Sequence, residues 1–224
     1  MARYQNVFRS RKSRPLRTIK KKYLIVSEGC VTEPEYFAKI DKLTTDQIEV
    51  RCISSPGRSL SPCGILKRIE DLIREQTLFP SDEIWAVLDR DEWPIEQLGK
   101  LGGWGRKRRG RSIGMSNPKF EYWLLLHFEK PKKGLSANDC DAALQKYLPN
   151  YDKHVRTEIC MDQVHQAIAR AKAQDVPRCE FFPEQNGSTV YRLLERIFAG
   201  TVNADQSDGQ PRSEERRVGK ECRS

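Results

Sequence analysis

Three acidic side chains stand where the chain passes from an apolar run into a turn. Glu28 follows one such run directly, and Asp89 and Asp91 follow another, residues 83–88. The spacing of two residues turns the side chains of Asp89 and Asp91 to the same side of an extended backbone. Carboxylates that have no histidine or cysteine partner suit a hard, oxygen-preferring ion, so these acids predict a Mg²⁺ or Mn²⁺ site.

Each of these acids also has a simpler interpretation. Asp89 and Asp91 can cap the following turn, and Glu28 can open the helix that comes next. Three carboxylates in one partly buried crevice repel one another, however, so their joint placement calls for a cation. The set of three therefore favours metal binding, and an ion that activates water suits the hydrolysis of phosphodiesters.

The elements that position these acids follow from an alternation of strand and helix patterns. The expected strands are 23–27, 48–54, 83–88 and 111–115. The expected helices are 32–43, 61–78, 95–101, 119–128, 138–148, 158–174 and 188–198. Thr32 is expected to be the N-cap of the first helix, with Glu35 completing a capping box. Ser61 and Pro62 are expected to begin the second helix, and Ser188 to cap the last. This alternation predicts an α/β fold: a single domain with a mainly parallel central sheet and flanking helices, in which 23–27 is the central strand. Ligands of such sheets bind beyond the carboxyl ends of the strands, where the three acids stand.

The net charge of +9 is concentrated in one part of the chain. Residues 1–22 hold nine Lys or Arg and no acid, whereas residues 23–211 hold 26 basic and 28 acidic residues, a net charge of −2. We expect a basic arm over 1–22, a domain over 23–200 and a disordered tail over 201–224. Within the tail, 212–224 matches the translation of a common sequencing adapter and is expected to be non-native. The arm is either a solvated tail or a contact for nucleic acid.

A second basic segment, residues 102–111, combines glycines with a tryptophan. This composition predicts a mobile loop. Trp104 is expected to stack on a base while neighbouring cations hold phosphates, although a solvated loop is an equal alternative. The expected nucleic-acid contacts are Trp104, Arg106, Lys107, Arg108, Arg109 and Arg111, together with Lys20, Lys21 and Lys22 of the arm.

Composition excludes several classes of protein. No apolar stretch approaches the ~20 residues of a membrane-spanning helix, and the apolar run 23–26 is too short for the core of a signal peptide. The seven cysteines form no Cys-x-x-Cys pair, so neither a zinc ribbon nor a redox motif is expected, and a cytoplasmic protein fits best. Residues 102–105 lack the Gly-Lys-Ser/Thr ending of a phosphate-binding loop, so any dependence on ATP needs a separate ATPase partner.

Three stretches of the chain resemble a known family. They read IVSEGCVTEPEYF (25–37), VLDRDE (87–92) and SNPKFEYWLLLHFE (116–129), and they look like the RloB family. Glu28 followed by a later Asp-x-Asp also resembles the TOPRIM domain of topoisomerases, primases and OLD-type nucleases. The resemblance covers about residues 22–199. It implies a TOPRIM-like, Mg²⁺-dependent nuclease fold and a role in bacterial defence against phage.

The resemblance also implies roles for single residues. Glu28 matches the TOPRIM glutamate that does general acid/base work, and Asp89 and Asp91 match the metal-binding pair. The pattern often continues with a third acid, but here Trp93 stands at that position. Glu121 is expected to compensate as a further catalytic acid; its alternative is a charge favoured at a helix N-terminus by the helix dipole.

The three histidines are not expected to take part. His127 lies roughly opposite Glu121 around the same expected helix, so we expect it to be a hydrogen-bonded core histidine. His154 and His165 have no acidic or cysteine neighbour at ligand spacing, and no role is predicted for either.

The leading hypothesis is thus a metal-dependent nuclease that acts on DNA or RNA. The alternative is a non-catalytic nucleic-acid sensor, or a partner subunit of a defence ATPase, whose acids bind a structural ion. A phosphatase with Asp89 as nucleophile fits less well, because the Lys and Ser/Thr motifs of such enzymes are not in place. Metal-dependent strand cleavage by the purified chain separates the first two hypotheses.

Overall fold

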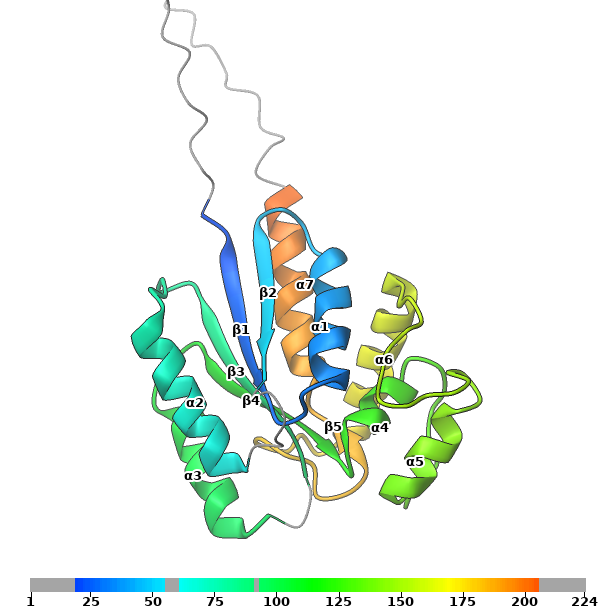
Figure 1. Ribbon diagram of the computed structural model, residues 1–224. Helices are drawn as coiled ribbons and strands as arrows, with labels where there is room; N and C mark the ends of the chain where they lie inside the picture. The colour runs from blue at the N-terminus through cyan, green and yellow to red at the C-terminus, as the bar shows by residue number, and fades with distance from the viewer. Residues whose placement is uncertain (1–18, 55–60, 91–92, 206–224) are drawn as a thin grey trace, which may run out of the picture.

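A computed structural model describes residues 19–54, 61–90 and 93–205 (Figure 1). Its centre is a five-stranded sheet in the order β2-β1-β3-β4-β5. The strands are β1 (Lys21–Ser27), β2 (Ile48–Ile53), β3 (Glu83–Asp89), β4 (Arg111–Asn117) and β5 (Gly187–Ser188). The first four are parallel, and the short β5 pairs antiparallel with β4. The predicted α/β fold with a mainly parallel sheet is therefore confirmed.

Helices cover both faces of the sheet (Figure 1). They are α1 (Thr32–Lys42), α2 (Pro62–Glu75), α3 (Ile95–Arg106), α4 (Phe120–Leu125), α5 (Ala137–Leu144), α6 (Met161–Gln174) and α7 (Tyr191–Asp205). One face packs against α2 and α3, and the other packs against α1, α4, α6 and α7, with α5 beyond α4.

The two faces of the sheet bury different side chains of the same strand. In β1, Tyr23 and Ile25 join the core under α1 and α7, while Leu24 and Val26 join the core under α2 and α3. All four are at most 2% exposed. Alternate side chains of a strand point to opposite faces, so a continuous apolar run is what a strand covered on both sides needs.

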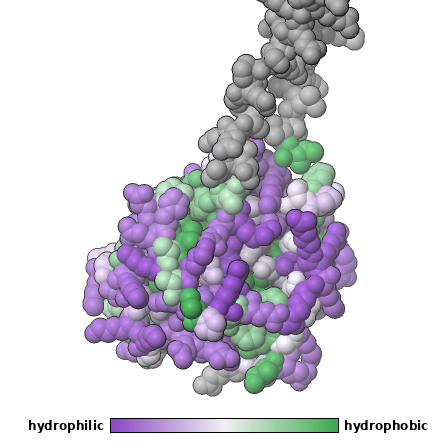
Figure 2. All heavy atoms as spheres, turned by 180° about the vertical axis from the view of Figure 1, so that it is seen from behind, coloured by the Kyte–Doolittle hydropathy of each residue, from purple (hydrophilic) through white to green (hydrophobic). Residues whose placement is uncertain are grey.

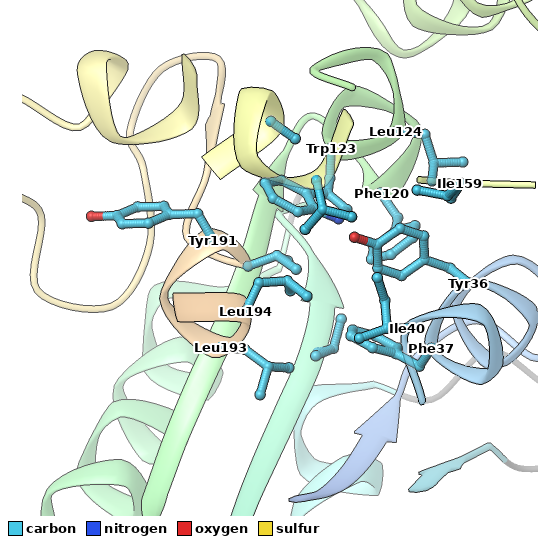
Figure 3. Close-up of a cluster of buried hydrophobic side chains, with 14 of the residues drawn as sticks. Tyr36, Phe37, Ile40, Phe120, Trp123, Leu124, Ile159, Tyr191, Leu193 and Leu194 are labelled. Atoms are coloured by element: carbon cyan, nitrogen blue, oxygen red, sulfur yellow. The ribbon is translucent and has the colours of Figure 1, made fainter. Parts of the chain in front are cut away.

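Aromatic rings from α1 and α4 meet aliphatic side chains in the larger core (Figure 3). The Tyr36 ring packs edge-on against Phe120 and Trp123, with centroids 5.4 and 6.4 Å away. The Tyr36 hydroxyl also lies 3.2 Å from Nε2 of His127, whose Nδ1 is 3.0 Å from the Trp123 carbonyl oxygen. Burial lowers the pKa of His127 to about 4. His127 is thus a hydrogen-bonded core histidine, as predicted.

The prediction of a loop over residues 102–111 is wrong for residues 102–106, whereas residues 107–110 do form a turn. Helix α3 continues through the glycines to Arg106, and β4 begins at Arg111. Leu98, Leu101 and Trp104 recur at a spacing of three residues and are all buried, so one face of the helix packs on the sheet. Tertiary packing therefore overrides the low helix propensity of glycine here.

Four smaller expectations also need correction. The middle of the sheet is β3 rather than residues 23–27, although β1 is an interior strand. Val31, not Thr32, precedes the first turn of α1 and no side chain caps it, while the Thr32 hydroxyl donates to the Lys153 carbonyl oxygen instead. Ser188 belongs to β5 and does not cap α7, which runs from Tyr191 to Asp205 and so ends later than the expected residue 198. The Ser61 cap of α2 is confirmed.

The surface seen in Figure 2 is mostly hydrophilic, with hydrophobic atoms in small areas. No helix in the described part of the chain has the length and apolar character required to cross a membrane.

Candidate functional site

A pocket of about 280 Å³ lies beyond the carboxyl ends of β1 and β3, beside the start of α4. Among the described residues, its charged lining consists of Glu28, Glu33, Asp89, Glu121 and Lys153. Four carboxylates thus share this pocket with one ammonium group. Of the four expected acids, Glu28, Asp89 and Glu121 lie together at this edge of the sheet, and Asp91 lies outside the described residues.

Hydrogen bonds from backbone N–H groups hold Glu28 and Asp89 in place. The Glu28 N–H donates to the Val87 carbonyl oxygen at 2.9 Å, which ties the end of β1 to β3. The Asp89 N–H donates to Oε2 of Glu28 at 3.1 Å, and Oδ1 of Asp89 accepts from the Phe120 N–H at 2.8 Å. Asp89 therefore connects β3 to the first turn of α4, where the N-terminal N–H groups of the helix favour a carboxylate.

Glu33 is a site residue that sequence reasoning missed. It lies in the first turn of α1, is 4% exposed, and accepts a hydrogen bond from the Gly29 N–H at 3.1 Å. Burial, together with the charges of Glu121 and Glu28, raises its pKa to about 7 despite that hydrogen bond. The only signal in the sequence is a second acid five residues after Glu28, which is also typical of an exposed helix start.

The Gly29 backbone and the Glu33 carboxylate approach each other closely. A Cβ atom at position 29 would overlap the carboxylate oxygens of Glu33. A side chain at position 29 would therefore displace the Glu33 carboxylate from its present position in the pocket.

Glu121 already has three partners, one of which is the Lys119 ammonium, 4.0 Å from its Oε2. It lies in the first turn of α4 and is 2% exposed. Its Oε1 accepts from the Tyr151 hydroxyl at 2.9 Å and from the Lys153 ammonium at 2.6 Å. Burial lowers the pKa of Lys153, but the contact with Glu121 outweighs burial and the pKa is raised. Lys153 is a second site residue that the sequence did not reveal.

The segment that carries Lys153 is anchored on the start of α1. The Tyr151 hydroxyl lies 3.1 Å from Oγ1 of Thr32. His154, for which no partner was expected, places Nδ1 2.6 Å from Oε1 of Glu35. The backbone of Lys153 is left-handed, with φ of 76°, which turns its side chain to the pocket while its carbonyl meets Thr32.

The donor set of this pocket suits a Mg²⁺ or Mn²⁺ ion. Glu28 and Asp89 offer oxygen ligands, while Asp91, the third expected ligand, lies outside the described residues. Within the described ranges, no three His, Cys, Asp or Glu side chains are grouped so that they could hold an ion. Mg²⁺ keeps several waters and often takes only one or two carboxylates from the protein, so two acids in a negatively charged pocket fit it.

The expected nucleic-acid contacts lie elsewhere. Trp104 is 6% exposed and belongs to the core, so the expectation that it stacks on a base is wrong. Arg106 forms a bidentate ion pair with Glu180, whereas residues 107–109 are exposed. Arg111 begins β4 at the amino end of the sheet and is partly buried.

The three lysines at the end of the arm are also at the amino end of the sheet. Lys20 is exposed, but the Lys21 ammonium lies 2.9 Å from Oε1 of the buried Glu83, and the Lys22 N–H donates to Asp82. A strand of seven residues separates this end from the acidic pocket, or ~20 Å at about 3.3 Å per residue.

Comparison with known proteins agrees with the resemblance seen in the sequence. A family model described as RloB-like protein matches residues 23–197. No curated protein and no solved structure matches the chain. The matched range begins within β1, contains all the described acids of the pocket and ends within α7. The chain therefore belongs to the RloB-like family.

Proposed function

We propose that this chain is a metal-dependent nuclease that hydrolyses phosphodiester bonds in nucleic acid. The observation that carries the proposal is the excess of buried negative charge in the pocket at the ends of β1 and β3. Four carboxylates face one ammonium group there, and the raised pKa of Glu33 reflects the charges of Glu121 and Glu28 in addition to burial. A divalent cation offsets such an excess.

The proposed roles follow from the contacts of each side chain. Glu28 and Asp89 hold the ion together with Asp91. When bound, the ion stabilises charge on the attacked phosphate and lowers the pKa of a water. We assign to Glu28 the uptake of the proton released from that water. Glu33, whose pKa is raised to about 7 when no ion is bound, lies beside it as a further carboxyl group.

Lys153 supplies the positive charge that a phosphate needs in an acidic pocket. Its ammonium is held by Glu121, yet its side chain remains 55% exposed and lines the pocket. Because the Glu121 carboxylate holds the Lys153 ammonium at 2.6 Å, the ammonium is already positioned when a phosphate oxygen binds. Glu121 then acts as a positioning residue rather than as a metal ligand.

A second function remains in competition with this one. In a nucleic-acid sensor, or a partner subunit of a defence ATPase, the same acids would hold a structural ion only. The observation that favours it is the ion pair between Lys153 and Glu121, since this pair already neutralises one of the acids. The proposed role in bacterial defence against phage rests on the family resemblance.

Cleavage by the purified chain tests the proposal. The substrates are single-stranded DNA, duplex DNA, structured RNA and tRNA, each with Mg²⁺, with Mn²⁺ and with EDTA, and each with and without an ATPase encoded beside the gene. The reference is Asp89→Asn, and the matched control is Asp46→Asn, an exposed aspartate in the turn before β2. Metal-dependent cleavage by the wild type and by the control, but not by Asp89→Asn, supports the proposal. If the wild type, Asp89→Asn and Asp46→Asn all show the same background level of cleavage on every substrate, the proposal is refuted.

A further inference from the structure

We propose that a second, larger pocket binds unpaired nucleotides of a single-stranded nucleic acid next to the acidic pocket. This pocket has a volume of about 820 Å³ and follows the β5 edge of the sheet. Its walls come from α3, residues 130–134, the end of α6 and residues 175–189. The biological use of this pocket rests on the proposed nuclease function, but nucleotide binding by it can be measured without cleavage.

The register of the sheet places the two pockets side by side. Asp89 of the acidic pocket pairs with Ser116 of β4, and Ser116 pairs with Ser188 of β5. Ser188 lines the larger pocket. Two strand spacings of about 4.8 Å each separate Asp89 from Ser188, or ~10 Å in all. A strand of nucleic acid lying in the larger pocket can therefore present a neighbouring phosphate to the acids.

The charge of the larger pocket is opposite to that of the acidic one. Lys130, Lys133 and Arg178 line it and form no ion pair within the described ranges. Three described acids also line it. Asp175 lies 2.6 Å from Arg192 and Glu180 is paired with Arg106, so only Glu184 offsets one of these three cations. The carboxylates of the acidic pocket repel a phosphate backbone. The phosphates on either side of the one that is cleaved therefore need cations outside the acidic pocket.

The larger pocket also has apolar walls. Val176 is 76% exposed at its rim, next to Pro177, and Phe181 and Phe182 are partly buried in its lining. Its volume is in the range of pockets that enclose small organic groups, about 300–1,000 Å³. Apolar walls beside cations match a nucleotide whose base is unpaired, whereas a duplex keeps its bases stacked inside and offers only phosphates.

Hydrogen bonds hold the walls in place without a ligand. The Arg192 guanidinium, 9% exposed, donates to the carbonyl oxygens of Cys179 and Glu180. The Asn186 amide donates to the Leu135 carbonyl oxygen, and the Asn117 amide donates to the Pro183 carbonyl oxygen. A pocket built in this way binds without the cost of ordering its loops.

Binding of a labelled oligonucleotide tests the inference on the full chain. The probes are fluorescein-labelled oligo(dT), oligo(U) and a blunt DNA duplex, measured by anisotropy in EDTA so that cleavage is excluded. The variant is Lys130→Glu/Lys133→Glu/Arg178→Glu, and the matched control is Lys42→Glu/Lys67→Glu/Lys146→Glu, three exposed lysines on or beside α1, α2 and α5. The wild type and the control should bind a single strand more tightly than the duplex. In the variant, single-strand affinity should fall at least tenfold, and the slope of log affinity against log salt should become shallower by ~0.7 per lost contact.

A crosslinking experiment locates the bound strand directly. A photoreactive benzoylphenylalanine replaces Val176, or replaces Phe79, an exposed residue before β3 that lies outside the larger pocket. Crosslinks to the single strand should form at position 176 and not at position 79. Unchanged affinity in the triple variant, a preference for the duplex, or equal crosslinking at the two positions overturns the inference. The nuclease proposal is tested separately, because Asp89→Asn should abolish cleavage and leave this binding intact.

Discussion

The Asp89 N–H donates a hydrogen bond to the Glu28 carboxylate over 3.1 Å, so the two acids at the ends of β1 and β3 are joined to each other. Asp89 in turn uses Oδ1 to accept the Phe120 N–H at the start of α4. The side chains that are proposed to hold the ion therefore also hold the pocket together. A substitution that tests them must remove the charge and keep the hydrogen bonds.

Asp89→Asn removes the charge of Asp89 and keeps an oxygen that can accept from Phe120. We expect metal-dependent cleavage to be lost while the melting temperature is unchanged or raised, because one carboxylate fewer repels its neighbours. Glu28→Gln should abolish turnover with a smaller loss of metal affinity, since a positioned acid–base group contributes ~10²–10⁴-fold to the rate. Calorimetric titration with Mg²⁺ and cleavage assays measure the two effects. A variant that cuts as fast as the wild type contradicts the assignment.

Lys153→Gln should lower the stability of the folded protein more than Glu121→Gln does. It leaves the Glu121 carboxylate, 2% exposed, with only the more distant Lys119 ammonium at 4.0 Å. We expect this to lower the free energy of unfolding by about 1–2 kcal/mol, a modest value because Lys153 is half exposed. The double variant should recover stability, as a double-mutant cycle by chemical denaturation will measure. Glu121→Gln should keep its Mg²⁺ affinity; a large loss of affinity would make Glu121 a metal ligand.

Glu33→Gln should change how stability depends on pH. The pKa of Glu33 rises from 4.5 to about 7 on folding, so the folded protein holds this proton more tightly than the unfolded chain. The free energy of unfolding therefore falls as pH rises from about 4.5 to about 7, by on the order of 3 kcal/mol for this group. In the variant this contribution disappears, so its stability relative to the wild type should be greater at pH 8 than at pH 5.

Denaturation at the two pH values measures the difference for Glu33→Gln and for Glu70→Gln, an exposed glutamate of α2 that serves as control. The comparison with the wild type is needed because His127 acts in the opposite direction. Its pKa is lowered from 6.5 to about 4, so its contribution is lost as pH falls through that window. Equal pH dependence in the wild type and in Glu33→Gln would show that Glu33 does not titrate abnormally.

Trp104→Ala should act on stability rather than on nucleic-acid binding. Trp104 packs with Leu98 and Leu101 under the sheet, so its truncation should cost ~3–5 kcal/mol of unfolding free energy. Trp104→Phe should cost less, because most of the buried ring is kept. Urea denaturation and oligonucleotide affinity are measured on the same preparations. Loss of affinity without loss of stability would restore the earlier idea of a stacking residue.

Local patterns were sufficient for most of the fold. Continuous apolar runs predicted β1 and β3, because a strand covered on both faces buries nearly every side chain, and alternating apolar residues predicted β2. Helical spacing predicted α2 and α6 to within a few residues. The glycine-rich end of α3 was mistaken for a loop, although its glycines leave room for the Phe181 ring. That ring lies so close to Gly102 and Gly105 that a Cβ there would come within 3.3 and 3.1 Å of it.

By itself, the sequence determined that Glu28 and Asp89 meet at one edge of a parallel sheet, because each directly follows an apolar strand and the carboxyl ends of parallel strands share an edge. Only the tertiary structure decided that Glu33 and Lys153 join them. Glu33 reaches the pocket because position 29 has no side chain, and Lys153 reaches it because residues 151–155 fold back onto the start of α1. The contacts of residues 151–155 with α1 join segments more than a hundred residues apart and leave no periodic trace in either, so spacing along the chain cannot reveal them.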